Sequence, residues 1–168
     1  MAETIASPQD LFEHHLKTML WVERKLSDEV LPELAGLVQS PELKRDVEAH
    51  LGETREHVNT LERVFGLINV KPQAAESEAL KGVRNDHDQG LKLLSGGDTV
   101  PADAWHAGAI AKTEHVEIAA YRELIELAEQ LGDEAVAIAL QENLEQEEQA
   151  LRKAEQALRK LLREDVRT

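Results

Sequence analysis

Two carboxylates, Glu114 and Glu117, lie on what should be the apolar stripe of a long helical segment. The segment covers residues 109–131 without Pro or Gly, and its apolar residues recur at steps of three and four back to Tyr121. The same stripe, continued toward the N-terminus, reaches Glu117 and then Glu114. A carboxylate on a buried stripe is costly unless it is paired or bound to metal, so this pair predicts partners elsewhere in the chain.

Further acidic residues fall on or beside the apolar stripes of three other predicted helices. Because a helix rises about 1.5 Å per residue, their distances from the helix ends allow them to share one level of a bundle. The second helix adds two histidines, one on each side of its glutamate. We therefore predict one layer of metal ligands, made up of Glu23, His50, Glu53, His57, Glu114, Glu117 and Glu147.

Carboxylates and imidazoles are the ligands that Fe²⁺ and Mn²⁺ accept, and bridging carboxylates offset the repulsion between two neighbouring cations. Di-iron bundles use one Glu from each of two helices and a Glu-x-x-His from each of the other two. This chain departs from that pattern, because its candidate histidines are concentrated on the second helix and the fourth helix has none. The pattern predicts a dinuclear site for two iron ions, with manganese as the alternative.

The same residues permit a second interpretation without metal. The carboxylates would then be protonated or hydrogen-bonded to histidines, and the bundle would act without catalysis, through a dimer face or other protein contacts. The sequence leaves open whether the protein is an enzyme. A metal-dependent oxidase or peroxidase activity, with peroxide or dioxygen as oxidant, is the reaction class that a dinuclear site would support. No phosphate-binding glycine loop or other cofactor motif indicates a different enzyme class.

Four long helices must position the layer, and we predict them over residues 8–38, 41–68, 103–131 and 133–163. Ser7-Pro8 and Ser40-Pro41 place a capping serine before a proline at the first helical position. Residues 69–102, broken by Pro and Gly, form a predicted crossover containing short helices. No strand pattern occurs. The prediction is an all-α protein with one domain over residues 1–168, an antiparallel four-helix bundle of the ferritin-like type.

Composition limits the partners. The chain of 168 residues has 33 acidic and 19 basic residues and a net charge of −14, which disfavours nucleic acid and anionic membranes as partners. No apolar run approaches the roughly 20 residues of a membrane helix. The N-terminus lacks the pattern of a secretory signal. The absence of cysteine excludes disulfides and thiolate sites, so we expect a cytoplasmic protein.

Three blocks, His50-Leu51-Gly52-Glu53-Thr54, residues 114–121 and Leu144-x-x-Glu147, together resemble the YciE/YciF-like ferritin-like family of bacteria. The likeness covers all four long helices. It implies a four-helix bundle with a dinuclear metal centre, a homodimer and a link to stress responses.

The resemblance also implies roles for single residues. It points to His50 and His57 as nitrogen ligands. The tyrosine that the family usually has near position 20 is replaced by Leu20-Trp21, which leaves Tyr121 as the only tyrosine in the chain. The implied carboxylate ligands are Glu23, Glu53, Glu114, Glu117 and Glu147.

Overall fold

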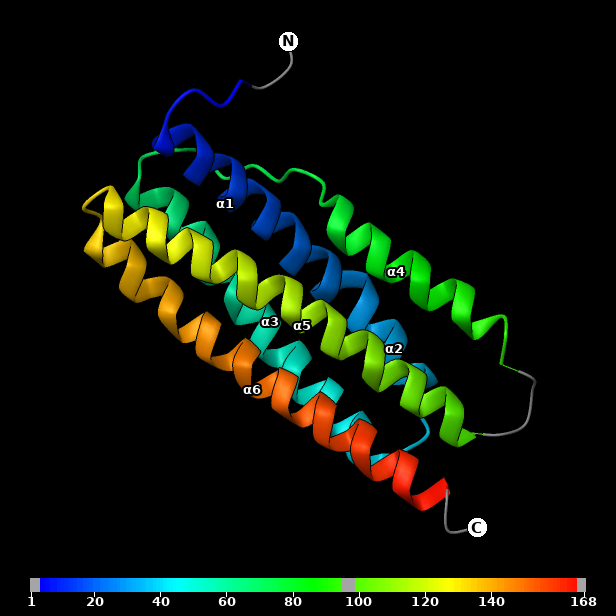
Figure 1. Ribbon diagram of the computed structural model, residues 1–168. Helices are drawn as coiled ribbons and strands as arrows, with labels where there is room; N and C mark the ends of the chain where they lie inside the picture. The colour runs from blue at the N-terminus through cyan, green and yellow to red at the C-terminus, as the bar shows by residue number, and fades with distance from the viewer. Residues whose placement is uncertain (1–3, 95–98, 166–168) are drawn as a thin grey trace.

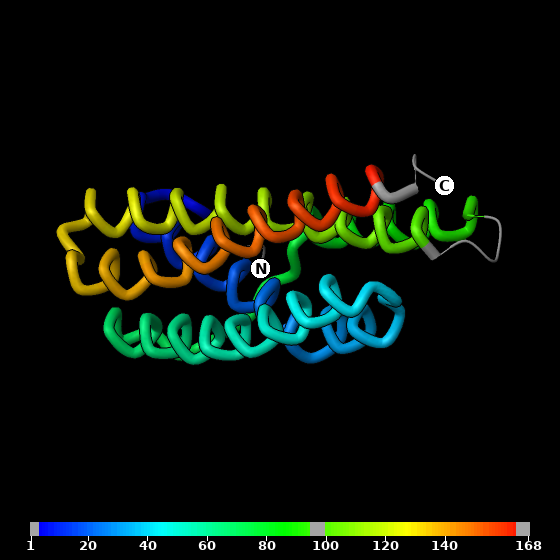
Figure 2. Tube along the Cα trace, turned by 90° about the horizontal axis from the view of Figure 1, so that it is seen from below, coloured from blue at the N-terminus to red at the C-terminus, as the bar shows by residue number. Residues whose placement is uncertain are grey.

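The computed structural model describes residues 4–94 and 99–165, and every regular element in them is helical. Four long helical segments pack into a bundle in which each runs antiparallel to its neighbours (Figures 1 and 2). The predicted all-α, ferritin-like antiparallel bundle is confirmed, and the helices begin and end within a few residues of the expected positions. The elements are α1 (Pro8–Lys25), a π-helical turn (Leu26–Val30), α2 (Leu31–Leu37), α3 (Pro41–Leu67), α4 (Glu78–Leu91), α5 (Thr99–Gln130) and α6 (Glu134–Asp165).

The helix starts use the caps that the sequence predicts. The side chains of Ser7 and Ser40 each accept a hydrogen bond from the backbone N–H three residues later, at the starts of α1 and α3. Asp103 of α5 adds a second restraint, because its carboxylate accepts from the N–H groups of Gln39 (3.0 Å) and Ser40 (2.6 Å). These bonds tie the turn between α2 and α3 to the beginning of α5.

The first long helix continues past Pro32 through a π-helical turn. Proline lacks an N–H, so the carbonyl four residues earlier loses its usual partner, and the helix widens just before the ring. The N–H of Leu31 bonds to the carbonyl of Leu26, five residues back. Helix α2 then extends to Leu37. The wide turn begins three residues after Glu23, so the backbone irregularity lies beside the predicted ligand layer.

The crossover covers the length of the bundle from outside (Figure 1). Its first part is extended and bonds to α1 through Ala75 N–H and the carbonyl of Lys17 at 3.0 Å. Its described part then contains one helix, α4, which packs against α5. Residues 95–98 of the predicted crossover lie outside the described residues. Trp105 of α5 lies against Gly90 of α4 and donates its indole N–H to the carbonyl of His87 at 3.0 Å.

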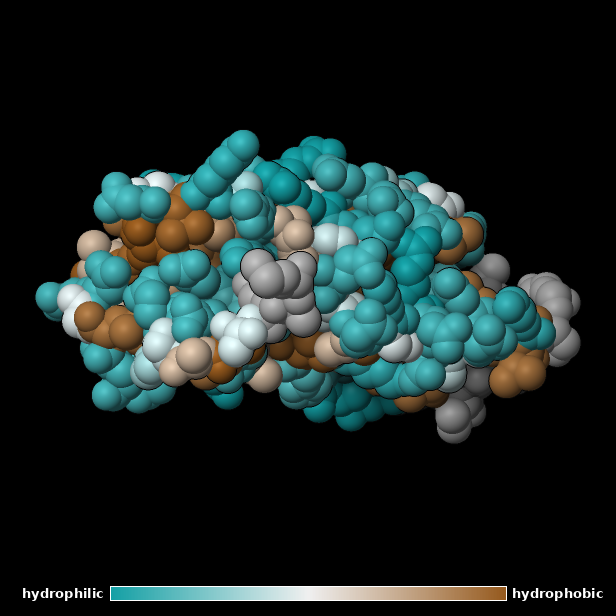
Figure 3. Space-filling model, turned by 90° about the horizontal axis from the view of Figure 1, so that it is seen from above, coloured by the Kyte–Doolittle hydropathy of each residue, from teal (hydrophilic) through white to brown (hydrophobic). Residues whose placement is uncertain are grey.

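A polar layer interrupts the apolar core. On α1 the buried Leu16 and Leu20 precede the buried Glu23, and the buried Leu26 of the π-helical turn follows it. The outer surface, in contrast to the core, is mainly hydrophilic on the face shown in Figure 3, with separate hydrophobic patches. No helix of the described residues is both long and apolar enough to cross a membrane.

The contact between Gly90 and Trp105 can be tested with two alanine variants of α4. A Cβ at Gly90 would lie 1.9 Å from the Trp105 ring, whereas a Cβ at Gly82 meets nothing within 4 Å. We expect Gly90→Ala to lower the free energy of unfolding by about 1–3 kcal/mol. Gly82→Ala should raise it by up to about 1 kcal/mol, because alanine is the better helix former. Denaturant unfolding measures both, and stabilisation by Gly90→Ala would contradict the packing.

Candidate metal centre

Carboxylates and imidazoles from all four bundle helices meet in the core. Glu23 comes from α1, His50 and His57 from α3, two glutamates from α5, and Glu147 from α6. Four of these residues are completely buried, and the two others are at most 5% exposed. Charged groups are rarely buried without partners, so this layer is the strongest functional signal in the core. The six residues are Glu23, His50, His57, Glu114, Glu117 and Glu147.

The layer divides into two groups that share one residue. In each group the potential ligand atoms all lie within 4.8 Å of one another. Glu147 belongs to both groups, so its carboxylate faces both positions. This arrangement suits two cations with a carboxylate between them. The first group is His50, Glu114, Glu117 and Glu147, and the second is Glu23, His57 and Glu147.

Most of the ligand atoms have no hydrogen-bond partner among the described residues. Both oxygens of Glu117 are buried and unpaired. His57 Nδ1 lies 2.8 Å from Glu147 Oε1, but neither atom has a directed hydrogen bond. Unpaired buried carboxylates cost free energy, and the same lone pairs are what a divalent cation requires. The residues therefore fit a metal centre.

Burial and mutual repulsion change the pKa values of the carboxyl groups. Burial, reinforced by the neighbouring carboxylates, raises the pKa of Glu117 well above its usual range. Burial also raises the pKa of Glu23, and it raises that of Glu147 to about 7. Without metal, the layer therefore retains protons near neutral pH.

The pKa values of the two histidines are raised, which stabilises the charged form of each ring. Burial lowers the pKa of His57, but Glu23 and Glu147 outweigh it and raise the value to about 10. Burial likewise opposes charge on His50, and Glu114 is the main cause of a pKa well above the usual range. Without metal, the two imidazolium groups thus supply part of the positive charge that balances the carboxylates.

Glu53 lies beside the layer. Its side chain is 28% exposed, and Oε2 lies 3.4 Å from His50 Nδ1. The buried stripe of α3 passes through Thr54, one residue further, which turns Glu53 outward. Its contact holds the His50 ring so that Nε2 faces Glu114 Oε1 at 3.3 Å. A carboxylate behind a histidine is the usual way to orient a metal-binding imidazole.

Three further residues hold the ligands, and the sequence pattern did not single them out as such. Gln146 Oε1 lies 2.7 Å from His57 Nε2 and accepts its N–H, so that the Nδ1 lone pair faces the layer once the ring loses its other proton. The hydroxyl of Tyr121 donates to Glu23 and accepts from Asn143 at 2.9 Å. Tyr121 lies one helical turn after Glu117, and Asn143 one turn before Glu147. Because residues four apart share a helix face, this spacing could have predicted that Tyr121 and Asn143 lie beside the layer.

The stability of the metal-free protein should fall as pH rises. His57 has a folded pKa of about 10 against 6.5 ordinarily, so its stabilisation is complete below pH 6.5 and is lost toward pH 10. The pKa of Glu147, raised to about 7, also makes stability fall as pH rises, up to about pH 7. Each proton held only by the folded state contributes a slope of about −1.4 kcal/mol per pH unit. Denaturant unfolding in chelator between pH 6 and 9 measures this slope, and a flat or rising profile would contradict it.

Comparisons with known proteins agree with this architecture. The family described as Domain of unknown function (DUF892) matches residues 7–167. YciF of Escherichia coli strain K12 is 31% identical over 140 residues, which are 83% of this chain and 82% of YciF.

Two solved structures share the fold. The crystal structure of the E. coli stress protein YciF has a TM-score of 0.87 at 28% identity, covering 95% of this chain and 99% of that one. YcfI of Rhodopseudomonas palustris has a TM-score of 0.87 at 27% identity, covering 92% and 97%. The chain therefore belongs to the DUF892 family, and its resemblance to YciF-like proteins is confirmed.

Proposed function

We propose that this protein binds two metal ions, iron or manganese, in the carboxylate–histidine layer. The observation that carries the proposal is the pair of buried ligand groups sharing Glu147, with unpaired oxygen and nitrogen atoms. His50, Glu114 and Glu117 would hold one ion, Glu23 and His57 the other, and Glu147 both.

The charges of the layer support two divalent ions. Four buried carboxylates supply four negative charges, which two M²⁺ ions balance, and neutral imidazoles complete the ligand set. A charge-neutral buried centre avoids the penalty of an uncompensated buried charge. Oxygen and imidazole ligands without sulfur suit iron and manganese, and the chain has no cysteine.

The neighbouring residues keep the ligands in place. Tyr121 donates to Glu23 Oε1, which leaves the unpaired Oε2 for a cation. Gln146 and Glu53 orient the rings of His57 and His50. The complete burial of Glu23, Glu117 and Glu147 keeps bulk water away from these three carboxylates.

The reaction class follows from the metal. When bound, iron or manganese would supply the redox chemistry with peroxide or dioxygen that carboxylates and imidazoles lack. The similar E. coli protein is described as a stress protein, which supports a role of this chain in stress responses. The expected homodimer stays a prediction.

Replacing Glu147 tests the shared ligand. We expect the chelator-treated protein to take up about two Mn²⁺, or Fe²⁺ under anaerobic conditions, per chain, with a rise in melting temperature. Glu147→Gln should lose both ions, because it removes a ligand from each group. Glu145→Gln, an exposed position on the same helix, is the matched control and should bind like the parent. Elemental analysis against protein concentration gives the stoichiometry, and equal metal content in Glu147→Gln would contradict the shared site.

Metal uptake should release protons. At pH 7 the metal-free layer holds a proton on His57, whose pKa is about 10, and a metal ion must displace it. We therefore expect the release of at least about one proton per chain and tighter binding at higher pH. Titration with Mn²⁺ in a weakly buffered indicator solution measures the release. Binding without proton release would show that the imidazole is not a ligand.

A non-catalytic bundle is the second candidate. The contacts of His57 Nδ1 with Glu147 (2.8 Å) and of His50 Nε2 with Glu114 (3.3 Å) favour it, since these pairs partly compensate the buried charges without metal. Glu117 lacks such a pair. Glu117→Gln should then raise stability whether or not metal is added. Under the metal proposal, the same change stabilises only the metal-free protein and reduces the metal-dependent rise in melting temperature.

A further inference from the structure

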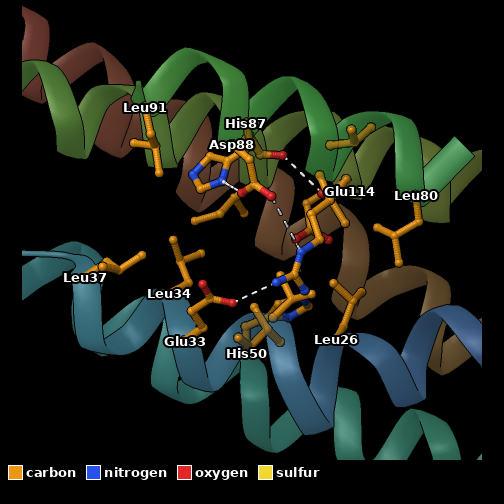
Figure 4. Close-up of a pocket in the computed structure, with 17 residues that line it drawn as sticks. Leu26, Glu33, Leu34, Leu37, His50, Leu80, His87, Asp88, Leu91 and Glu114 are labelled. Carbon is orange, nitrogen blue, oxygen red and sulfur yellow. Dashed lines mark hydrogen bonds and ion pairs between the residues drawn. The ribbon is translucent and has the colours of Figure 1, made fainter. Parts of the chain in front are cut away.

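A pocket beside the metal layer opens between α2, α4 and α5. Its cavity volume is about 70 Å³, several times the ~10–15 Å³ needed to hold one water molecule. His50 and Glu114 line its inner side. In Figure 4, leucines of the two walls, such as Leu34 and Leu91, face each other across the space. The pocket therefore reaches two of the candidate ligands from a mainly apolar approach.

The walls are mainly apolar, and they come from elements distant in sequence. Leu26 belongs to the π-helical turn that follows α1, Leu80 to the crossover helix α4, and Ile110 to α5. A second, smaller pocket of about 20 Å³ reaches His50 from the side of α6, with Asp46 and Lys153 in its lining. Its size suits little more than one water molecule. Of these two pockets that reach His50, the one between α2 and α4 is the one with room for a small organic molecule.

Arg84 provides a polar group in this apolar lining. Its Nη2 lies 2.9 Å from Glu33 Oε2, an ion pair that joins α4 to α2, and its Nε lies 4.0 Å from Asp88. Its Nη1 is buried and has no hydrogen-bond partner among the described residues. A buried N–H donor without an acceptor costs free energy, so this nitrogen is available to an oxygen atom of a bound molecule.

The surrounding charges select a neutral molecule. Glu33 and Asp88 already offset the positive charge of Arg84, and at the inner side Glu114 is paired with His50, so three carboxylates face two cationic groups. A carboxylate in this pocket would face a local excess of negative charge. A neutral hydroxyl or carbonyl oxygen can accept from Nη1 without that repulsion.

We propose that this pocket binds a small, neutral, mainly apolar molecule with a hydroxyl or carbonyl oxygen, such as a phenol. The oxygen accepts from Arg84 Nη1, and the apolar part lies among the leucines beside His50 and Glu114. Its role as the substrate of the centre rests on the proposed metal function, whereas its binding to the pocket does not.

The probe is 4-fluorophenol, followed by fluorine NMR with the full-length, metal-free protein. We expect saturable binding, and binding of 4-fluorobenzoate about tenfold weaker because of its charge. Arg84→Met should weaken phenol binding about tenfold, because the donor is lost. Arg122→Met, which removes an exposed arginine paired with Glu148 on the bundle surface, is the matched control and should leave binding unchanged.

A second variant fills the pocket and leaves Arg84 unchanged, because the Arg84→Met substitution could weaken binding indirectly. Val83 lines the pocket and is only partly buried, so Val83→Phe should fill the space while circular dichroism shows an intact fold. We expect about a tenfold rise in the dissociation constant. No saturable binding by the parent protein, or equal binding by Val83→Phe, would overturn the proposal. Tighter binding of the benzoate would overturn the neutral ligand class.

The same probe separates this proposal from the metal function. In Mn²⁺-loaded protein, bound 4-fluorophenol should show a strongly broadened fluorine signal, because the paramagnetic ion is close to the pocket. The broadening should be absent in Glu147→Gln, while phenol binding persists. Phenol binding by a protein that takes up no metal would support the pocket and refute the metal function. Phenol binding without broadening in fully loaded protein would refute the substrate role.

Discussion

Four carboxylates buried in one layer of a helical core are the constraint on which this structure depends. Glu23, Glu114, Glu117 and Glu147 would repel one another strongly at low dielectric if all were ionised without partners. His50 and His57 supply at most two positive charges, and Glu117 touches neither in a directed bond. Protons or cations must complete the balance. Two divalent ions would complete it with neutral imidazoles, which links the fold to the proposed function.

Rigid helices suit this constraint because they hold side chains at set levels and angles. The residues around the layer add to this rigidity through hydrogen bonds to the backs of the ligands. Tyr121 donates to Glu23 and accepts from Asn143, and Gln146 accepts from His57. Such supporting contacts orient metal ligands in many proteins. The layer is thus built in advance and would not have to be assembled by a metal ion.

The crossover helix α4 gives this bundle a feature that four helices alone would not have. It packs on α5, where Gly90 accommodates the ring of Trp105, and it forms one wall of the apolar pocket. Arg84 joins this wall to α2 through Glu33. The widened turn before Pro32 contributes Leu26 and Val30 to the facing wall. A connection between bundle helices therefore also shapes the approach to the candidate centre.

The sequence alone was sufficient to predict the four long helices, their serine caps and most residues of the buried polar layer. Helix starts depend on local signals such as Ser7-Pro8 and Ser40-Pro41. The burial of Glu114 and Glu117 follows from the 3.6-residue period, which is also local. Only the tertiary structure could decide between neighbours such as Glu53 and Thr54, because the rotation of α3 is set by packing against the other helices.

Contacts between residues distant in the sequence also could not be predicted from the sequence. That Glu147 is shared by two ligand groups depends on the register of α6 against three helices. Tyr121 and Glu23 are 98 residues apart, and Arg84 and Glu33 are 51 apart. Periodicity predicts which face of a helix is buried, but it contains no information on crossing angles or on the level at which two helices meet. Those quantities follow from side-chain packing across the whole core, and they determine the geometry of the site.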